Sequence, residues 1–219
     1  MQVGVLSDVH ANRIALDAVI EDMPDVEGLV HAGDVVGYNP WPAECVEQLQ
    51  SLDVVSVSGN HDRAVATGTG FRFNSMAQAG VQYAISSLDD EHVAWLTSLP
   101  DSRRAFDERV RVVHGHPDDP DRYTYPDDVE ADLLGSESVL VLGHTHVQHV
   151  EHFDDGVVLN PGSVGQPRDG DPRAAYATVD LDDGSVDLHR VEYDVERVVE
   201  AVEDAGLPSR IGTRLRDGR

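Results

Sequence analysis

The sequence has no lysine, a single cysteine and few aromatic residues, which make up 5% of its 219 positions. The lone Cys45 rules out an internal disulfide and fits a reducing cytoplasm. No apolar run approaches the roughly 20 residues that cross a bilayer, and the N-terminus lacks a charged stretch followed by an apolar one. We therefore expect a cytoplasmic protein with no membrane partner.

Positive charge is also scarce. The 16 basic residues are all arginine, they face 41 acidic residues, and the formal net charge is −25. A carboxylate-rich surface without ammonium groups is typical of adaptation to multimolar salt, where charges are screened within about 3 Å. The alternative is a protein that is merely acidic. We expect no basic patch that could neutralise phosphates, which disfavours bulk binding of nucleic acid at low salt.

Apolar runs alternate with helical patterns over the first two thirds of the chain, which indicates an α/β fold. Strands are expected at residues 3–6, 28–30, 54–57, 110–113 and 139–142, with helices from residue 12, after residue 42, and at 75–88 and 89–96. Asp-Gly turns at 155–156 and 183–184 then predict hairpins, with strands at 175–181 and 186–193. A helix at 194–205 follows. We expect one domain over residues 1–207 and a loose polar tail at 208–219.

Five of these strands are followed by side chains that can bind a metal: Asp8 and His10, Asp34, Asn60, His114, and His144 with His146. The C-terminal ends of strands are where open α/β sheets build their sites. Two carboxylates, one amide oxygen and four imidazoles suit Mn²⁺, Fe, Co, Ni or Zn rather than calcium. Asp34 could bridge two ions about 3.5–4 Å apart, the spacing used in two-metal hydrolysis. Two such ions would attract a phosphate.

The same residues form five motifs: Asp8-x-His10, Gly33-Asp34, Gly59-Asn60-His61-Asp62, His114-Gly115-His116 and Gly143-His144-Thr145-His146. In order and spacing they resemble the motifs of the calcineurin-like metallophosphoesterases, over about residues 1–193. Segments 37–40 and 160–168 resemble the small single-domain prokaryotic branch of that family. The resemblance implies a four-layer α-β-β-α sandwich of two mixed sheets flanked by helices.

The resemblance also implies two metal ions, with Mn²⁺ expected and Fe, Ni, Co or Zn as alternatives. One would be held by Asp8, His10, Asp34 and His146, and the other by Asp34, Asn60, His114 and His144. The implied mechanism is in-line attack on phosphorus by a hydroxide that forms from water between the metals. His61 is then placed to protonate the leaving oxygen or to stabilise its charge.

Substrate contacts are expected from Asn60, His61 and His116, with a loop-capping role as the alternative for His116. Arg168 and Arg173 flank an Asp-rich loop at 169–171, and we expect them to pair with its carboxylates rather than with phosphate.

The leading hypothesis is a dinuclear metal-dependent phosphoesterase that hydrolyses a small phosphodiester or phosphomonoester. The alternative from another class is a non-catalytic metal-binding interaction module on the same fold, although all seven ligand positions and His61 are present. Within enzymes, the alternatives are a protein Ser/Thr phosphatase and a dinucleoside polyphosphate hydrolase. Protein phosphatases of this family carry an Asp and an Arg soon after the second-motif Asp, where this chain has Val35-Val36-Gly37-Tyr38. A homo-oligomer is compatible with the sequence.

Overall fold

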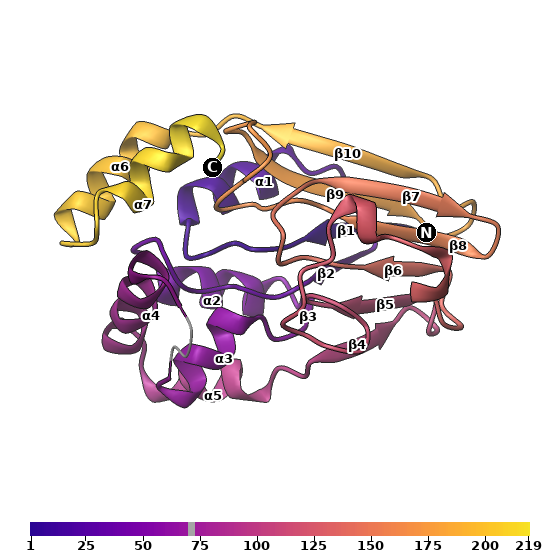
Figure 1. Cartoon of the computed structure of the whole chain (residues 1–219), viewed down its shortest axis with the longest axis horizontal. Coiled ribbons are helices and arrows are strands. Elements are labelled where there is room, and N and C mark those ends of the chain that lie inside the picture. Colours follow the sequence, from indigo (N-terminus) through magenta and orange to yellow (C-terminus); the bar gives the residue numbers. More distant parts are fainter. Residues whose placement is uncertain (70–72) are drawn as a thin grey trace.

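The computed structural model describes residues 1–69 and 73–219 (Figure 1). Within them lie two five-stranded sheets. The first contains, in spatial order, β10 (Val186–Val191), β9 (Ala174–Asp180), β1 (Gln2–Leu6), β2 (Gly28–His31) and β3 (Val55–Ser56). The second contains β4 (Ser102–Ala105), β5 (Val110–Val113), β6 (Val139–Val141), β8 (Gly156–Asn160) and β7 (His149–Phe153).

Both sheets are mixed. Strands β1, β2 and β3 run parallel in the first sheet, and β5, β6 and β8 run parallel in the second. The pairs β1–β9 and β4–β5 are antiparallel, and so are the two hairpins β7–β8 and β9–β10. The C-terminal ends of the central parallel strands therefore lie along one edge of each sheet, which is where the motif residues follow.

Aliphatic side chains join the two sheets face to face. Val3 and Val5 of β1 share one fully buried cluster with Val112 of β5 and Val141 of β6. Because side chains alternate between the faces of a strand, Leu6 points to the other side and joins a second cluster with the helices. The predicted sandwich of two sheets is confirmed.

Helices α1 (Arg13–Asp22), α2 (Pro42–Ser51), α4 (Ser75–Ser87) and α5 (Asp90–Ser98) contribute to the cluster that covers the first sheet. A further helix, α3 (Asn60–Thr67), begins at the motif residue Asn60. Two short 3₁₀ helices, η1 (Pro126–Asp128) and η2 (Ala131–Leu133), accompany the loop over the outer face of the second sheet. Pro126 is at the first position of η1, where a helix tolerates the missing N–H.

The expected loose tail at 208–219 is a wrong prediction. After α6 (Val195–Asp204), the chain forms α7 (Arg210–Thr213) and the 3₁₀ helix η3 (Arg214–Asp217). Ile211 and Leu215, four residues apart, are fully buried in one cluster with Tyr38. Burying these two side chains offsets the entropy of ordering the segment. Figure 1 shows α6 and α7 together at one end of the molecule, in yellow.

Among the described residues, no helix has both the length and the apolar character needed to cross a membrane.

Candidate metal centre

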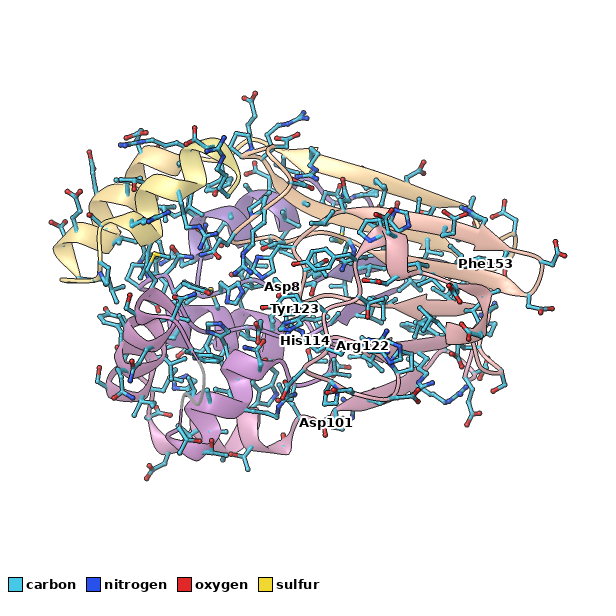
Figure 2. The ribbon with its side chains drawn as sticks, in the orientation of Figure 1. Asp8, Asp101, His114, Arg122, Tyr123 and Phe153 are labelled. Carbon is cyan, nitrogen blue, oxygen red and sulfur yellow. The ribbon has the colours of Figure 1, made fainter. Side chains whose placement is uncertain are left out.

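Loops at the C-terminal ends of the parallel strands bring the motif residues together. Asp8 follows β1, and its N–H donates to the carbonyl of Gly33, directly before Asp34, at 2.9 Å. The two sheets are linked here, because Nδ1 of His114 lies 2.7 Å from the carbonyl oxygen of Ala32. Figure 2 shows Asp8 and His114 near the middle of the molecule, between the helices and the strands.

Several of the expected ligands have a left-handed backbone. The φ angles are +52° at Asp8, +60° at Asp34, +66° at His144 and +59° at His146. Such conformations cost about 1–3 kcal/mol each in residues other than glycine and persist only where the surroundings enforce them. Their concentration in the motif loops is typical of a functional site.

A first group of donor atoms comes from Asp8, His10 and His146, whose ligand atoms lie within 4.8 Å of one another. Oδ2 of Asp8 accepts hydrogen bonds from Ser7 Oγ at 2.5 Å and from the N–H of His144 at 3.0 Å. Oδ1 of Asp8 is buried and has no hydrogen-bond partner, although it lies 3.1 Å from Nε2 of His146. One oxygen thus fixes the carboxylate, and the other is free for a ligand.

The histidine rings in this group present lone pairs to each other. Nδ1 of His10 contacts the carbonyl of Val36 at 3.1 Å, and Nδ1 of His146 contacts that of Gln166 at 2.6 Å. A carbonyl only accepts, so each Nδ1 carries the proton and each Nε2 does not. The two Nε2 atoms are 3.1 Å apart. Burial lowers the pKa of both rings, which keeps them neutral. Two facing lone pairs repel each other unless a cation lies beside both. A histidine that binds a metal through one ring nitrogen usually donates the N–H of its other ring nitrogen to a carbonyl, as both rings do here.

A second group is formed by Asp34, His114 and His144, again within 4.8 Å. Asn60 belongs beside it, since its Oδ1 lies 3.2 Å from Nε2 of His114. Oδ2 of Asp34 is 3.5 Å from Nε2 of His114 and 3.6 Å from Nε2 of His10 in the first group. One oxygen of Asp34 therefore lies between the two groups, where a bridging ligand would be.

The two buried carboxylates attract positive charge. Burial alone would lower the pKa of His114, but the charge of Asp34 and its hydrogen bond outweigh that effect and raise the pKa to about 9. Burial lowers the pKa of His144 to about 3, and the charge of His114 adds to the effect. The raised pKa of His114 shows that the site beside Asp34 favours a positive charge. Its oxygen and nitrogen donors suit a divalent transition metal in the place of that proton.

His61 lies beside both groups. It is 4% exposed, and its ring packs between Tyr38, at a centroid distance of 4.7 Å, and Phe73, at 4.6 Å. Burial lowers its pKa to about 4. A Cβ at Gly37, where φ is +92°, would lie 2.3 Å from Nδ1 of His61, so the ring requires glycine there. With His10 and Asp34, His61 forms a third set of donor atoms within 4.8 Å.

Asp62, whose role the sequence alone does not reveal, holds two of the ligand loops in place. Its Oδ2 accepts the N–H groups of Asp34 at 2.8 Å and Gly59 at 3.0 Å, and its Oδ1 accepts that of Val36 at 3.2 Å. Burial and the nearby charge of Asp34 raise its pKa to about 7. The signal was in the motif, where Asp62 follows His61 directly.

A cavity of about 500 Å³ opens beside the second group and is lined by Asn60, Arg63, Ala64, Thr67, Thr69, Phe73, Asp121, Tyr123 and His144. The ring of Tyr123 stacks on the ring of His144, with the two centroids 3.8 Å apart. Arg63 is engaged by the carboxylates of Asp121 and Asp101. The lining of the cavity therefore combines two aromatic rings, Phe73 and Tyr123, with two of the expected metal ligands, Asn60 and His144.

His116 lies apart from these groups. Its Nδ1 accepts the N–H of Asp118 at 3.1 Å, and it lines a different cavity, of about 340 Å³, with Arg122 and several acidic residues. The hydrogen bond to Asp118 lies within the loop of His116, as expected if His116 caps that loop.

The pairing expected for Arg173 is confirmed, but the one expected for Arg168 is wrong. Arg173 Nη2 lies 2.6 Å from Asp171, and that bond lowers the pKa of Asp171 to about 2. Asp169 pairs with Arg190 of β10 instead of Arg168. Arg168 donates to Oε1 of Gln166 at 2.7 Å, and its main-chain N–H donates to the carbonyl of His146, which turns this segment toward the metal centre.

Residues 1–184 match the family model described as the calcineurin-like phosphoesterase superfamily domain. A crystal structure of a metallophosphoesterase from Sphaerobacter thermophilus is 36% identical, with a TM-score of 0.88, and the match covers 100% of this chain and 99% of that one. An uncharacterized protein of Methanocaldococcus jannaschii is 32% identical over 99% of this chain and 98% of its own length. The phosphodiesterase YfcE of Escherichia coli is 28% identical, over 83% of this chain and 89% of its own length. The family match spans every expected ligand, from Asp8 to His146, and ends before α6.

Proposed function

The chain belongs to the calcineurin-like phosphoesterase superfamily, as its five motifs predicted, and from this premise we propose that it is a dinuclear metal-dependent phosphoesterase. Its substrate in this proposal is a small phosphodiester or phosphomonoester. The observation that carries the proposal is the convergence of donor atoms from both sheets, with Oδ2 of Asp34 between the two groups.

We propose two metal ions, with Mn²⁺ as the expected ion and Fe, Ni, Co or Zn as alternatives. The first set of ligands is Asp8, His10, Asp34 and His146, and the second is Asp34, Asn60, His114 and His144. When bound, the ions would supply the acidity that turns water into a nucleophile and the charge that stabilises phosphoryl oxygens.

The protein's own part is to hold these donors in place before any substrate arrives. The proton on each Nδ1 of His10 and His146 is fixed by a main-chain carbonyl, so each Nε2 keeps its lone pair toward the centre. Asp62 joins the loop of Asp34 to the start of α3, where Asn60 lies. Preorganised donors of this kind need little rearrangement during a reaction.

His61 is the proposed donor to the leaving oxygen. The rings of Tyr38 and Phe73 on its two sides prevent it from turning, and its main-chain N–H is bonded to Oδ1 of Asp34 at 2.8 Å. With its pKa lowered to about 4 by burial, the neutral ring can donate a hydrogen bond to the developing charge, and it can transfer a proton only in its protonated form.

The cavity supports a small substrate. A volume of about 500 Å³ is within the range of small-molecule sites. The stretch Val35-Val36-Gly37-Tyr38, where protein phosphatases of this family carry an Asp and an Arg soon after the second-motif Asp, contains neither residue. A phosphoprotein substrate would therefore lack the arginine that holds its phosphate, which favours a small ester over the phosphatase alternative.

The non-catalytic alternative requires a centre that binds metal without turnover. The complete donor set and the constrained His61 favour catalysis, because an interaction module needs neither. Substitution of His61 separates the two possibilities.

The test compares His61→Asn with Asn60→Ala on an alkyl and a nitrophenyl phosphoester, with the metal content of each variant. His61→Asn should keep both metals and lose roughly 10²–10⁴-fold in rate, most on the alkyl ester, whose leaving oxygen needs a proton. Asn60→Ala should weaken one metal and slow both esters alike. Equal losses on both esters would indicate charge stabilisation instead of proton transfer. Full activity of His61→Asn would remove it from the reaction.

A further inference from the structure

A group of arginines gathers next to the metal centre in a protein with few positive charges. Arg210, Arg214, Arg216 and Arg219 line a cavity of about 600 Å³, together with Asn74, Met76, Thr213 and Asp217. We call Arg168, Arg210, Arg214 and Arg219 the arginine cluster.

The cluster is joined to the metal centre through Tyr38. Nη2 of Arg168 lies 3.4 Å from the hydroxyl of Tyr38, and its guanidinium is 5.8 Å from the centroid of that ring. The ring of Tyr38 also contacts the rings of His61 and His10, at centroid distances of 4.7 and 4.8 Å. One aromatic side chain therefore separates the cluster from the proposed proton donor.

The C-terminal part of the cluster is fixed to the loop of Arg168. The N–H of Gly170 donates to the carbonyl of Gly218 at 3.0 Å. A Cβ at Gly218, where φ is +60°, would lie 2.6 Å from the main chain of Asp171, so the two segments fit closely. Ile211 and Leu215, both buried beside Tyr38, hold Arg214 next to this contact.

The positive charges of the cluster are not neutralised by side chains. Arg216 pairs with Glu196, and Arg173 and Arg190 pair with the nearby Asp-rich loop. Within residues 1–69 and 73–219, no carboxylate side chain forms an ion pair with any member of the arginine cluster. Nε of Arg214 donates to the main-chain oxygen of Arg219, the last residue of the sequence, and this carboxylate offsets one of the four positive charges.

Holding like charges together has a cost. Burial lowers the pKa of Arg214, and the charges of Arg168 and Arg210 lower it further. The chain has 41 acidic residues that could have relieved this repulsion. An anionic ligand would relieve it, and charged hydrogen bonds from guanidinium groups suit phosphate.

We propose that the arginine cluster binds a second phosphate of the substrate, so that the preferred substrate is a phosphoester with one phosphoryl group at the metal centre and another anionic group at the cluster. This deepens the proposed function and rests on it.

The test uses two nitrophenyl esters that differ by one phosphate: thymidine 5′-(p-nitrophenyl phosphate) and the same ester with a 3′-phosphate. The protein should prefer the second ester in kcat/KM, mainly through KM. Arg214→Gln should reduce that preference about 10–100-fold, the usual effect of losing a charged hydrogen bond. Arg214→Lys should restore part of it. Arg197→Gln on the exposed side of α6 is the matched control, since it removes one positive charge elsewhere and should leave the preference unchanged.

A binding measurement separates failure of this proposal from failure of the proposed hydrolysis. Inorganic tripolyphosphate should raise the melting temperature of the chelated protein more than inorganic phosphate does, and Arg214→Gln should abolish the difference. The proposal is overturned if the esters react equally, if Arg214→Gln and Arg197→Gln behave alike, or if tripolyphosphate has no greater effect than phosphate. It is also overturned if Arg214→Gln leaves the preference unchanged and instead dissociates an oligomer.

Discussion

Replacing Asp62 by alanine should loosen the metal centre and destabilise the whole domain. Its carboxylate accepts three main-chain N–H groups, from Asp34, Val36 and Gly59, and is itself fully buried. Asp62→Ala removes the acceptor for all three. Asp62→Asn can keep its amide oxygen where Oδ2 now lies, retain the bonds from Asp34 and Gly59, and lose only that from Val36.

The magnitude follows from the number of donors left without a partner. A buried N–H without an acceptor costs about 1–3 kcal/mol, so Asp62→Ala should cost about 3–9 kcal/mol. Relief of the repulsion between Asp62 and Asp34 offsets part of this, and we expect a value of about 3–5 kcal/mol. Asp62→Asn should cost about 1–3 kcal/mol. Domains of this kind are stable by only about 5–15 kcal/mol, so the alanine variant should be marginal.

Urea denaturation of the chelated proteins measures these differences, and elemental analysis after reloading with Mn²⁺ measures metal retention. Asp89→Ala is the matched control, because Asp89 accepts two N–H groups at the start of α5 in an exposed position. It should cost about 0.5–2 kcal/mol and leave metal binding intact. If Asp62→Ala were no less stable than Asp89→Ala and bound metal as wild type does, the role assigned to Asp62 would be refuted.

Three other predictions concern the centre, the surface and the single thiol. Asp34→Asn should lose affinity for both metals, because a neutral amide bridges poorly and offsets no charge; two ions retained per chain after chelation and reloading would contradict this. The melting temperature should rise as NaCl or KCl increases from about 0.1 M to multimolar concentrations, since screening weakens the repulsion behind a net charge of −25; a flat or falling curve would reject adaptation to salt. Burial raises the pKa of Cys45 well above its usual value, so iodoacetamide at pH 8 should modify it only in urea, and labelling of the folded protein would show that the thiol is accessible.

The parts of the fold that the sequence predicted are those with a strong local pattern. Continuous valine and leucine runs identify the central strands, and the Asp-Gly turns identify both hairpins. Strand β4 (Ser102–Ala105) was not predicted from the sequence, because it is an exposed edge strand with arginines at 103 and 104. Its position depends on pairing with β5, which no local pattern reveals.

The donor set of the centre could be predicted because each residue follows a buried strand directly. The role of Asp62 could not be derived in the same way, since its three partners come from distant loops that meet only in the folded chain. Arg168 shows the same limit. Its sequence neighbour Asp169 looked like its partner, but Arg190, from β10, occupies that carboxylate. The ordered C-terminal segment depends on two apolar side chains, Ile211 and Leu215, within an otherwise polar stretch.

The central claim is that the buried donor groups hold two metal ions that allow hydrolysis of a phosphoester. The most direct measurement titrates the chelated protein with Mn²⁺ while following both the ions bound per chain and the release of nitrophenolate from bis(p-nitrophenyl) phosphate and p-nitrophenyl phosphate. We predict no release without metal, and activity that rises until two ions are bound per chain. Two bound ions without hydrolysis of either ester would contradict the claim, and so would hydrolysis that does not depend on metal.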